Sequence, residues 1–145
     1  MSSKIRFFVP SPKTDKTGRP IAMDGMNDMI ARERGSLYAA AQAKKSMTAY
    51  VARVAAHAAY DMHWHTPEER CLVTLVFVEA NHRRDPDNIF GGAKYVLDGL
   101  TLRSDLGAGL IIDDSQQHID LVCKLSPHID RDRPGVWVII EKEDS

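Results

Sequence analysis

Acidic residues gather in two short segments of this sequence, in a pattern that could hold a divalent cation. Asp85 and Asp87 stand two residues apart after an apolar run, and Asp113 and Asp114 precede a second apolar run. Two like charges about 4 Å apart repel each other by roughly 1–4 kcal/mol, depending on the local dielectric. A chain that brings several carboxylates together therefore favours a cation between them, and their oxygens suit Mg²⁺, Mn²⁺ or Ca²⁺.

Basic residues lie beside the first acidic segment and dominate the first part of the chain. Arg83 and Arg84 directly precede Asp85, which indicates an anionic substrate such as a phosphodiester. The net charge is −1, but residues 1–84 have a balance of +5 and residues 85–145 a balance of −6. For each basic residue taken singly, an ordinary solubilising charge is the alternative to a role in binding. The candidates for phosphate contacts are Lys13, Lys16, Arg19, Arg32, Arg34, Arg83 and Arg84.

The length and composition predict one domain, residues 1–145, whose 43% of apolar residues is enough for a core. No run approaches the roughly 18 apolar residues that span a bilayer, and the first residues lack an apolar signal core. We therefore expect a cytoplasmic protein with no membrane contact. Cys71 and Cys123 are expected to be buried thiols. His63 and His65 lack a third soft ligand nearby in sequence, which disfavours a zinc site.

The elements that position the acidic residues are expected to alternate between strands and helices. Apolar runs rich in β-branched residues predict strands over 5–9, 71–79, 117–125 and 136–141. Apolar spacings of three and four predict helices from Ser36 to about 62, and from Asp87 or Asn88 to about 100. Gly91 and Gly92 make the start of the second helix irregular. Turn-forming residues predict a long, mobile, basic loop over 11–35.

These elements predict a single-domain α+β fold with a mixed sheet and two helices. If the strand extends to Asp87, then Asp85 and Asp87 point to one face of the sheet. Pro86 favours an extended Asp85. Asp113 and Asp114 stand at the entrance of another strand, and a neighbouring strand could bring them alongside. The sequence thus predicts a site for one or two divalent ions.

Four motifs occur in order between residues 83 and 116. They are Arg83-Arg-Asp-Pro-Asp-Asn88, the lysine Lys94, Val96-Leu-Asp-Gly-Leu100 and Asp113-Asp-Ser-Gln116. In this order they resemble the motifs of the RusA family of Holliday junction resolvases. The flanking elements fit as well, including a first strand that ends in Pro10-Ser-Pro12.

The resemblance implies a RusA-like, homodimeric, metal-dependent endonuclease that acts on four-way and other branched DNA in recombination and repair. It implies Mg²⁺ as the cofactor, with Mn²⁺ able to replace it, and paired symmetric nicks that leave 5′-phosphate ends. The catalytic residues would be Asp85, Asp87, Asp114 and Lys94, with Asp113 as a further metal ligand. Asp98 would have a structural role.

Lys94 departs from the family pattern, because it lies seven residues after Asp87 where the family has four. A surface lysine paired with Asp98 at i+4 is therefore an alternative to a catalytic lysine. Two other functions compete with the nuclease. One is a branched-DNA binding protein with weak or no cleavage, and the other is a structural domain whose acidic residues merely cap a helix.

Overall fold

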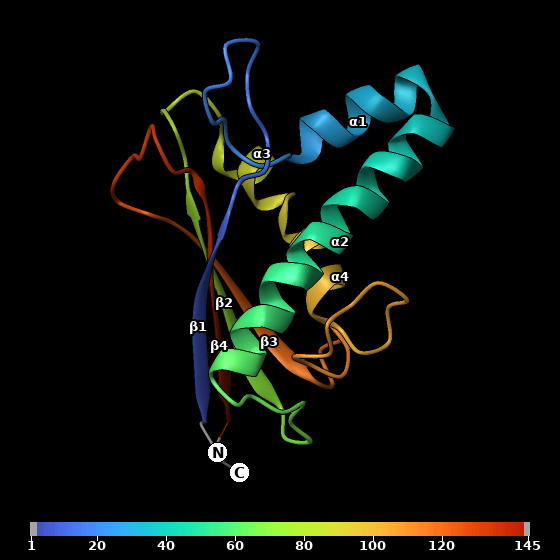
Figure 1. The fold of residues 1–145 in the computed structure, drawn as a ribbon, viewed down its shortest axis with the longest axis vertical. Coiled ribbons are helices and arrows are strands. Elements are labelled where there is room, and N and C mark those ends of the chain that lie inside the picture. Colours follow the sequence, from blue (N-terminus) through green and yellow to red (C-terminus); the bar gives the residue numbers. More distant parts are fainter. Residues whose placement is uncertain (1–2, 144–145) are drawn as a thin grey trace.

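A mixed four-stranded sheet forms the centre of the structure, a computed structural model that describes residues 3–143 (Figure 1). Its strands stand in the order β1-β4-β2-β3, so the strand from the end of the chain lies between the first two. β4 runs antiparallel to β1 and to β2, whereas β3 runs parallel to β2. The strands are β1 (Lys4–Pro10), β2 (Cys71–Val78), β3 (Ile119–Leu125) and β4 (Gly135–Lys142).

Four helices accompany this sheet in the described residues: α1 (Met26–Gly35), α2 (Leu37–Asp61), α3 (Pro86–Phe90) and α4 (Ala93–Leu100). α2 and α4 lie against one face of the sheet (Figure 1). Val51 of α2 and Val96 of α4 are fully buried in one core with Val73 of β2 and Val138 of β4. Ser36 caps α2 as its sequence predicts, because its hydroxyl accepts a hydrogen bond of 3.1 Å from the amide of Ala39. None of the helices in this part of the chain has the length and apolarity to cross a membrane.

The α+β class and the mixed sheet are confirmed, but the expected number of helices is wrong. Residues 26–35 form α1 where a loop was expected. α1 buries none of its residues, and its apolar stripe is short, since it consists of Met26, Met29 and Ile30 alone. Only residues 11–24 form a loop, closed by a β-bridge between Thr14 and Pro20. We call this loop the finger.

The second expected helix is split into α3 and α4 at Gly91 and Gly92. The N-terminus of α1 packs into this break. A side chain on Gly91 would come within 2.7 Å of the Met26 Cβ atom, so the close approach of α1 requires glycine there. The irregularity expected at these glycines is therefore a turn with i→i+3 hydrogen bonds that separates α3 from α4.

β3 forms one edge of the sheet and is poorly covered. Leu121, Val122 and Leu125 are 41%, 37% and 41% exposed, and Cys123 is only half-buried. Cys71 on the neighbouring strand is buried, as expected for both thiols. An exposed apolar edge strand readily pairs with another chain.

Candidate functional site

Asp85 and Asp87 lie beyond the C-terminal end of β2, at the start of α3. β2 ends at Val78, so the two residues do not alternate on a strand as the sequence analysis supposed. Asp85 is extended (φ −76°, ψ 150°), as the following proline requires, and Asp87 lies in the first turn of α3. Both line a hollow of about 380 Å³, which we call the acidic hollow. Its other lining residues are Met26, Asn27, Arg83, Arg84 and Asn88.

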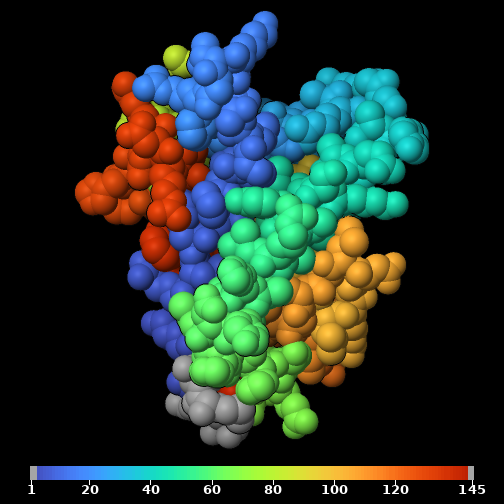
Figure 2. All heavy atoms as spheres, viewed as in Figure 1, coloured from blue at the N-terminus to red at the C-terminus, as the bar shows by residue number. Residues whose placement is uncertain are grey.

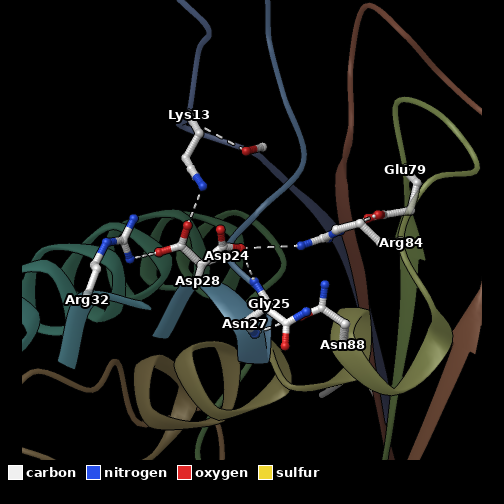
Figure 3. A network of polar contacts seen from close by, with 10 residues as sticks. Lys13, Asp24, Gly25, Asn27, Asp28, Arg32, Glu79, Arg84 and Asn88 are labelled. Carbon is white, nitrogen blue, oxygen red and sulfur yellow. Dashed lines mark hydrogen bonds and ion pairs between the residues drawn. The ribbon is translucent and has the colours of Figure 1, made fainter. Parts of the chain in front are cut away.

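Arg84 holds the segment before Asp85 in place (Figure 3). Its guanidinium donates two hydrogen bonds to the buried carboxylate of Glu79, at 2.8 and 2.9 Å, and lies 3.6 Å from Asp28 of α1. Such paired bonds fix both position and orientation. Glu79 and Asp28 therefore balance the positive charge of Arg84, and these contacts hold the backbone that leads to Asp85.

A second contact fixes the first turn of α3 against α1. The side-chain oxygen of Asn88 accepts a 2.8 Å hydrogen bond from the backbone amide of Asn27 (Figure 3). Gly25 approaches the backbone of Asn88 so closely that a side chain there would collide with it. The helix that the sequence did not predict is thus part of the framework of the acidic hollow.

Asp24 binds two more of the candidate basic residues. Its side chain is only 1% exposed, and it pairs with Lys13 of the finger and with Arg32 of α1 (Figure 3). Burial alone would raise the pKa of Asp24, but hydrogen bonds from Arg32 and Lys13 together outweigh burial and lower it. Like Arg84, Lys13 and Arg32 are therefore occupied by internal carboxylates.

Replacing Asp24 by asparagine is expected to destabilise the protein by about 1.5–3 kcal/mol at pH 7, the usual contribution of hydrogen bonds to a charged group. The lowered pKa means that this stabilisation is complete above the unfolded pKa near 3.9 and is lost as the pH falls through the lower folded pKa. Urea unfolding at several pH values measures both effects. Asp61→Asn, at an exposed residue of α2, is the control and should change stability by less than about 0.5 kcal/mol. Equal stability of D24N and the parent at pH 7 would contradict this role of Asp24.

Four of the candidate basic residues are exposed and form no ion pair within residues 3–143. They are Lys16 and Arg19 of the finger, Arg34 of α1, and Arg83. Only Arg83 of these lines the acidic hollow. The structure thus separates the predicted DNA contacts into three residues held by carboxylates and four that are free to bind an anion.

Asp113 and Asp114 lie at the other end of the sheet. They precede β3, which pairs in parallel with β2, so that Cys71 is opposite Ile119 and Phe77 is opposite Leu125. The start of β3 therefore lies far from the end of β2, where Asp85 and Asp87 are found (Figure 1). Asp113 is paired with Arg103 at 3.2 Å. Within residues 3–143, no three acidic, histidine or cysteine side chains are close enough to hold a metal ion. The expectation that a neighbouring strand brings the two acidic pairs together is wrong for a single chain.

Lys94 also lies apart from the acidic hollow. It is the second residue of α4, and its ammonium group is 3.3 Å from the carboxylate of Asp98, one turn later. It lines a separate hollow with Arg32 of α1 and Lys44 of α2. A pair of this kind contributes only about 0.2–0.5 kcal/mol. Arg83 and Arg84 are the cations that line the acidic hollow, and within residues 3–143 Arg83 is the one without an ion pair.

If the chain cleaves DNA, as its resemblance to the resolvase motifs implies, this arrangement predicts that Arg83 offsets the charge developing on the phosphate and that Lys94 does not. We expect Arg83→Ala to slow single-turnover cleavage about 10²–10³-fold, as loss of one transition-state donor does elsewhere. Lys94→Ala should cut within about threefold of the parent. Both rates are measured on a labelled four-way junction with saturating protein. Slow cleavage by K94A together with normal cleavage by R83A would reverse the assignment.

Comparisons with protein-family models and with curated proteins identify no relative of this chain. A scan against protein-family models gives no match to the chain, and a search of curated proteins gives none either. The resemblance to the RusA resolvases therefore depends on the motifs between residues 83 and 116, and the function has to be argued from the geometry of this chain.

Proposed function

We propose that the protein is a metal-dependent endodeoxyribonuclease that resolves four-way and other branched DNA junctions by paired symmetric nicks. The acidic hollow is the observation that carries this proposal. It places Asp85 and Asp87 beside the unpaired Arg83. Two carboxylates suit a cation and a free guanidinium suits a phosphate, so the same hollow is suited to a metal ion and to a DNA strand.

The residues of the acidic hollow fit Mg²⁺. They offer carboxylate and amide oxygens and no cysteine or histidine, and Mg²⁺ is commonly held by one or two carboxylates together with substrate phosphates. Mn²⁺ accepts the same ligands. Asp85 and Asp87 would hold the ion, and Arg83 would bind and neutralise the phosphate. A bound Mg²⁺ would supply a water of lowered pKa and polarise the scissile bond.

The exposed edge of β3 supports a homodimer. Two copies that pair antiparallel along β3 would cover the exposed Leu121, Val122 and Leu125 of both chains. The same pairing would place the start of one β3 beside the end of the other. Asp113 and Asp114 of the partner subunit would then approach Asp85 and Asp87, and two equivalent sites would form about a two-fold axis. One arrangement thus accounts for the apolar edge and for the separation of the acidic pairs.

A branched-DNA binding protein with weak or no cleavage is the second candidate. The placement of Lys94 favours it, because the ammonium group contacts Asp98 and lines a different hollow from Asp85 and Asp87. On this alternative Arg83 and the finger bind the junction, but no lysine takes part in chemistry.

A synthetic four-way junction, labelled on each strand in turn, separates these candidates. The nuclease should give symmetric nicks with 5′-phosphate ends in Mg²⁺ or Mn²⁺, and none in EDTA. In Ca²⁺, whose coordination is looser, it should bind the junction and cut little. Binding without nicks in either metal would favour the binding protein. Neither binding nor nicks, with an active control resolvase in parallel, would reject both.

A further inference from the structure

Three arginines from three separate loops line one cleft at the end of the sheet that carries Asp85 and Asp87. Arg19 comes from the finger, Arg83 from the loop after β2, and Arg131 from the loop between β3 and β4. The three loops project at the same end of the sheet (Figure 1), and Figure 2 shows the finger and the β3–β4 loop side by side on the surface. The cleft has a volume of about 380 Å³, and we call it the arginine cleft. Its remaining lining residues are Asp15, Pro20, Ile21, Ala80 and Asn81.

The arginine cleft and the acidic hollow both adjoin a third hollow of about 210 Å³. This third hollow shares Ile21, Ala80, Asn81 and Arg83 with the arginine cleft. It also shares Arg83 and Arg84 with the acidic hollow. We call the three adjoining hollows the groove; they extend from Arg131 past Arg83 to Asp87, and Arg83 lines each of them.

The charges in the arginine cleft favour an anion. Arg19, Arg83 and Arg131 are exposed, and none of them forms an ion pair with another described residue. Asp15 is the acidic residue in the lining. Hydrogen bonds from Thr17 and from the amide of Arg19 to its Oδ1 hold the pKa of Asp15 below its ordinary value, so the carboxyl group is ionised. One carboxylate thus faces three guanidinium groups.

Asp130 and Asp132, the acidic neighbours of Arg131 in the chain, do not line the arginine cleft. The Asp130 carboxylate accepts hydrogen bonds from the backbone amides of Asp132 and Arg133, and these bonds form a turn within the loop. Arg133 turns to the sheet and lies 4.9 Å from the centre of the Phe8 ring. Arg131 is therefore the guanidinium of this loop that reaches the cleft.

We propose that Arg19, Arg83 and Arg131 form a binding site for backbone phosphates of the DNA strand that continues from the cut. This inference rests on the proposed function and extends it. The guanidinium fork matches phosphate oxygens, so three such groups on one wall bind successive phosphates without reading the bases. Arg83 links the two parts of the groove, because it faces the scissile phosphate on one side and the flanking phosphates on the other.

Salt dependence of binding tests this site. The affinity for a labelled four-way junction is measured by fluorescence anisotropy in EDTA, at several KCl concentrations, for the parent and for Arg131→Ala, Arg19→Ala and the double variant. Each lost phosphate contact should lower the slope of log K against log salt by about 0.9. We expect weaker binding of every sequence by about 3–10-fold per arginine. Arg53→Ala, at an exposed arginine on α2, is the matched control and should bind like the parent.

The outcomes separate this site from the nuclease itself. If the slope of log K against log salt is the same in R131A and in the double variant as in the parent, the proposed phosphate site is wrong. Cleavage by the parent would still support the nuclease in that case. A parent that binds and does not cut, with slopes lowered by the variants, supports the site and rejects the nuclease. A parent that binds no DNA overturns both. Arg19→Ala keeps the backbone bond to Asp15, so it tests the site even if R131A fails to fold.

Discussion

Asp87→Asn is expected to abolish cleavage of four-way junctions while binding them at least as tightly as the parent does. Asp87 lines the acidic hollow next to Asp85 and Arg83, and among the described residues its carboxylate accepts one hydrogen bond, from the adjacent Asn88 amide at 3.0 Å. Removing its charge takes away a metal ligand and also removes a repulsion towards phosphate. We expect the single-turnover rate in Mg²⁺ to fall by at least about 10³-fold, more than for loss of one neutral donor. A mobility shift in Ca²⁺ measures the binding.

Asp98→Asn is the matched control for this variant. Asp98 is also a helical aspartate with basic neighbours, but these are Lys94 and Lys44, and it does not line the acidic hollow. Its substitution should leave cleavage within about threefold of the parent, the range expected when an exposed pair is lost. Loss of junction binding by D87N, with an unchanged circular dichroism spectrum, would mean that Asp87 supports the surface rather than the chemistry.

The strands and α2 were predictable because their patterns are local. β2 is an apolar, β-branched run, and α2 has an apolar stripe and a serine cap. α1 has only a short apolar stripe and begins after a glycine rather than a serine. It is held by contacts with residues about 60 positions away, such as the bond between Asn27 and Asn88, and these are invisible to periodicity. The break at Gly91 was predicted only as an irregularity, because its cause is the packing of Met26.

The residues of the candidate site also fall into those that local sequence predicts and those that only tertiary packing brings together. Asp85 and Asp87 share one short segment, so they were found together and remain together. Placing Asp113 and Asp114 beside them needed the direction of β3 relative to β2, which the sequence does not reveal. The partners of Lys13 and Arg84 are likewise set by tertiary packing. Nothing in the sequence singled out Arg131 as a binding residue, because it stands among alternating acidic and basic residues that are typical of an exposed polar loop.

Because the two acidic pairs lie far apart in one chain, we expect that mixing two inactive variants restores cleavage. If each site combines Asp85 and Asp87 of one subunit with Asp114 of its partner, then Asp87→Asn and Asp114→Asn should each be inactive alone. A mixed dimer of the two variants places both substitutions in one site and leaves the other site intact. Mixing them should therefore restore cleavage.

Random exchange makes half of the dimers mixed, so about one quarter of the parent's sites should be active. Because each mixed dimer has a single intact site, its product should be a single nick rather than paired nicks. A mixture of Asp85→Asn and Asp87→Asn is the control and should stay inactive, since those residues share one segment and every site then carries one substitution. Exchange is verified by size and by a tag on one variant. If the mixture of Asp87→Asn and Asp114→Asn stays inactive after complete exchange, the shared site is wrong. In that case each site lies within one chain, so that both sites of a mixed dimer carry a substitution.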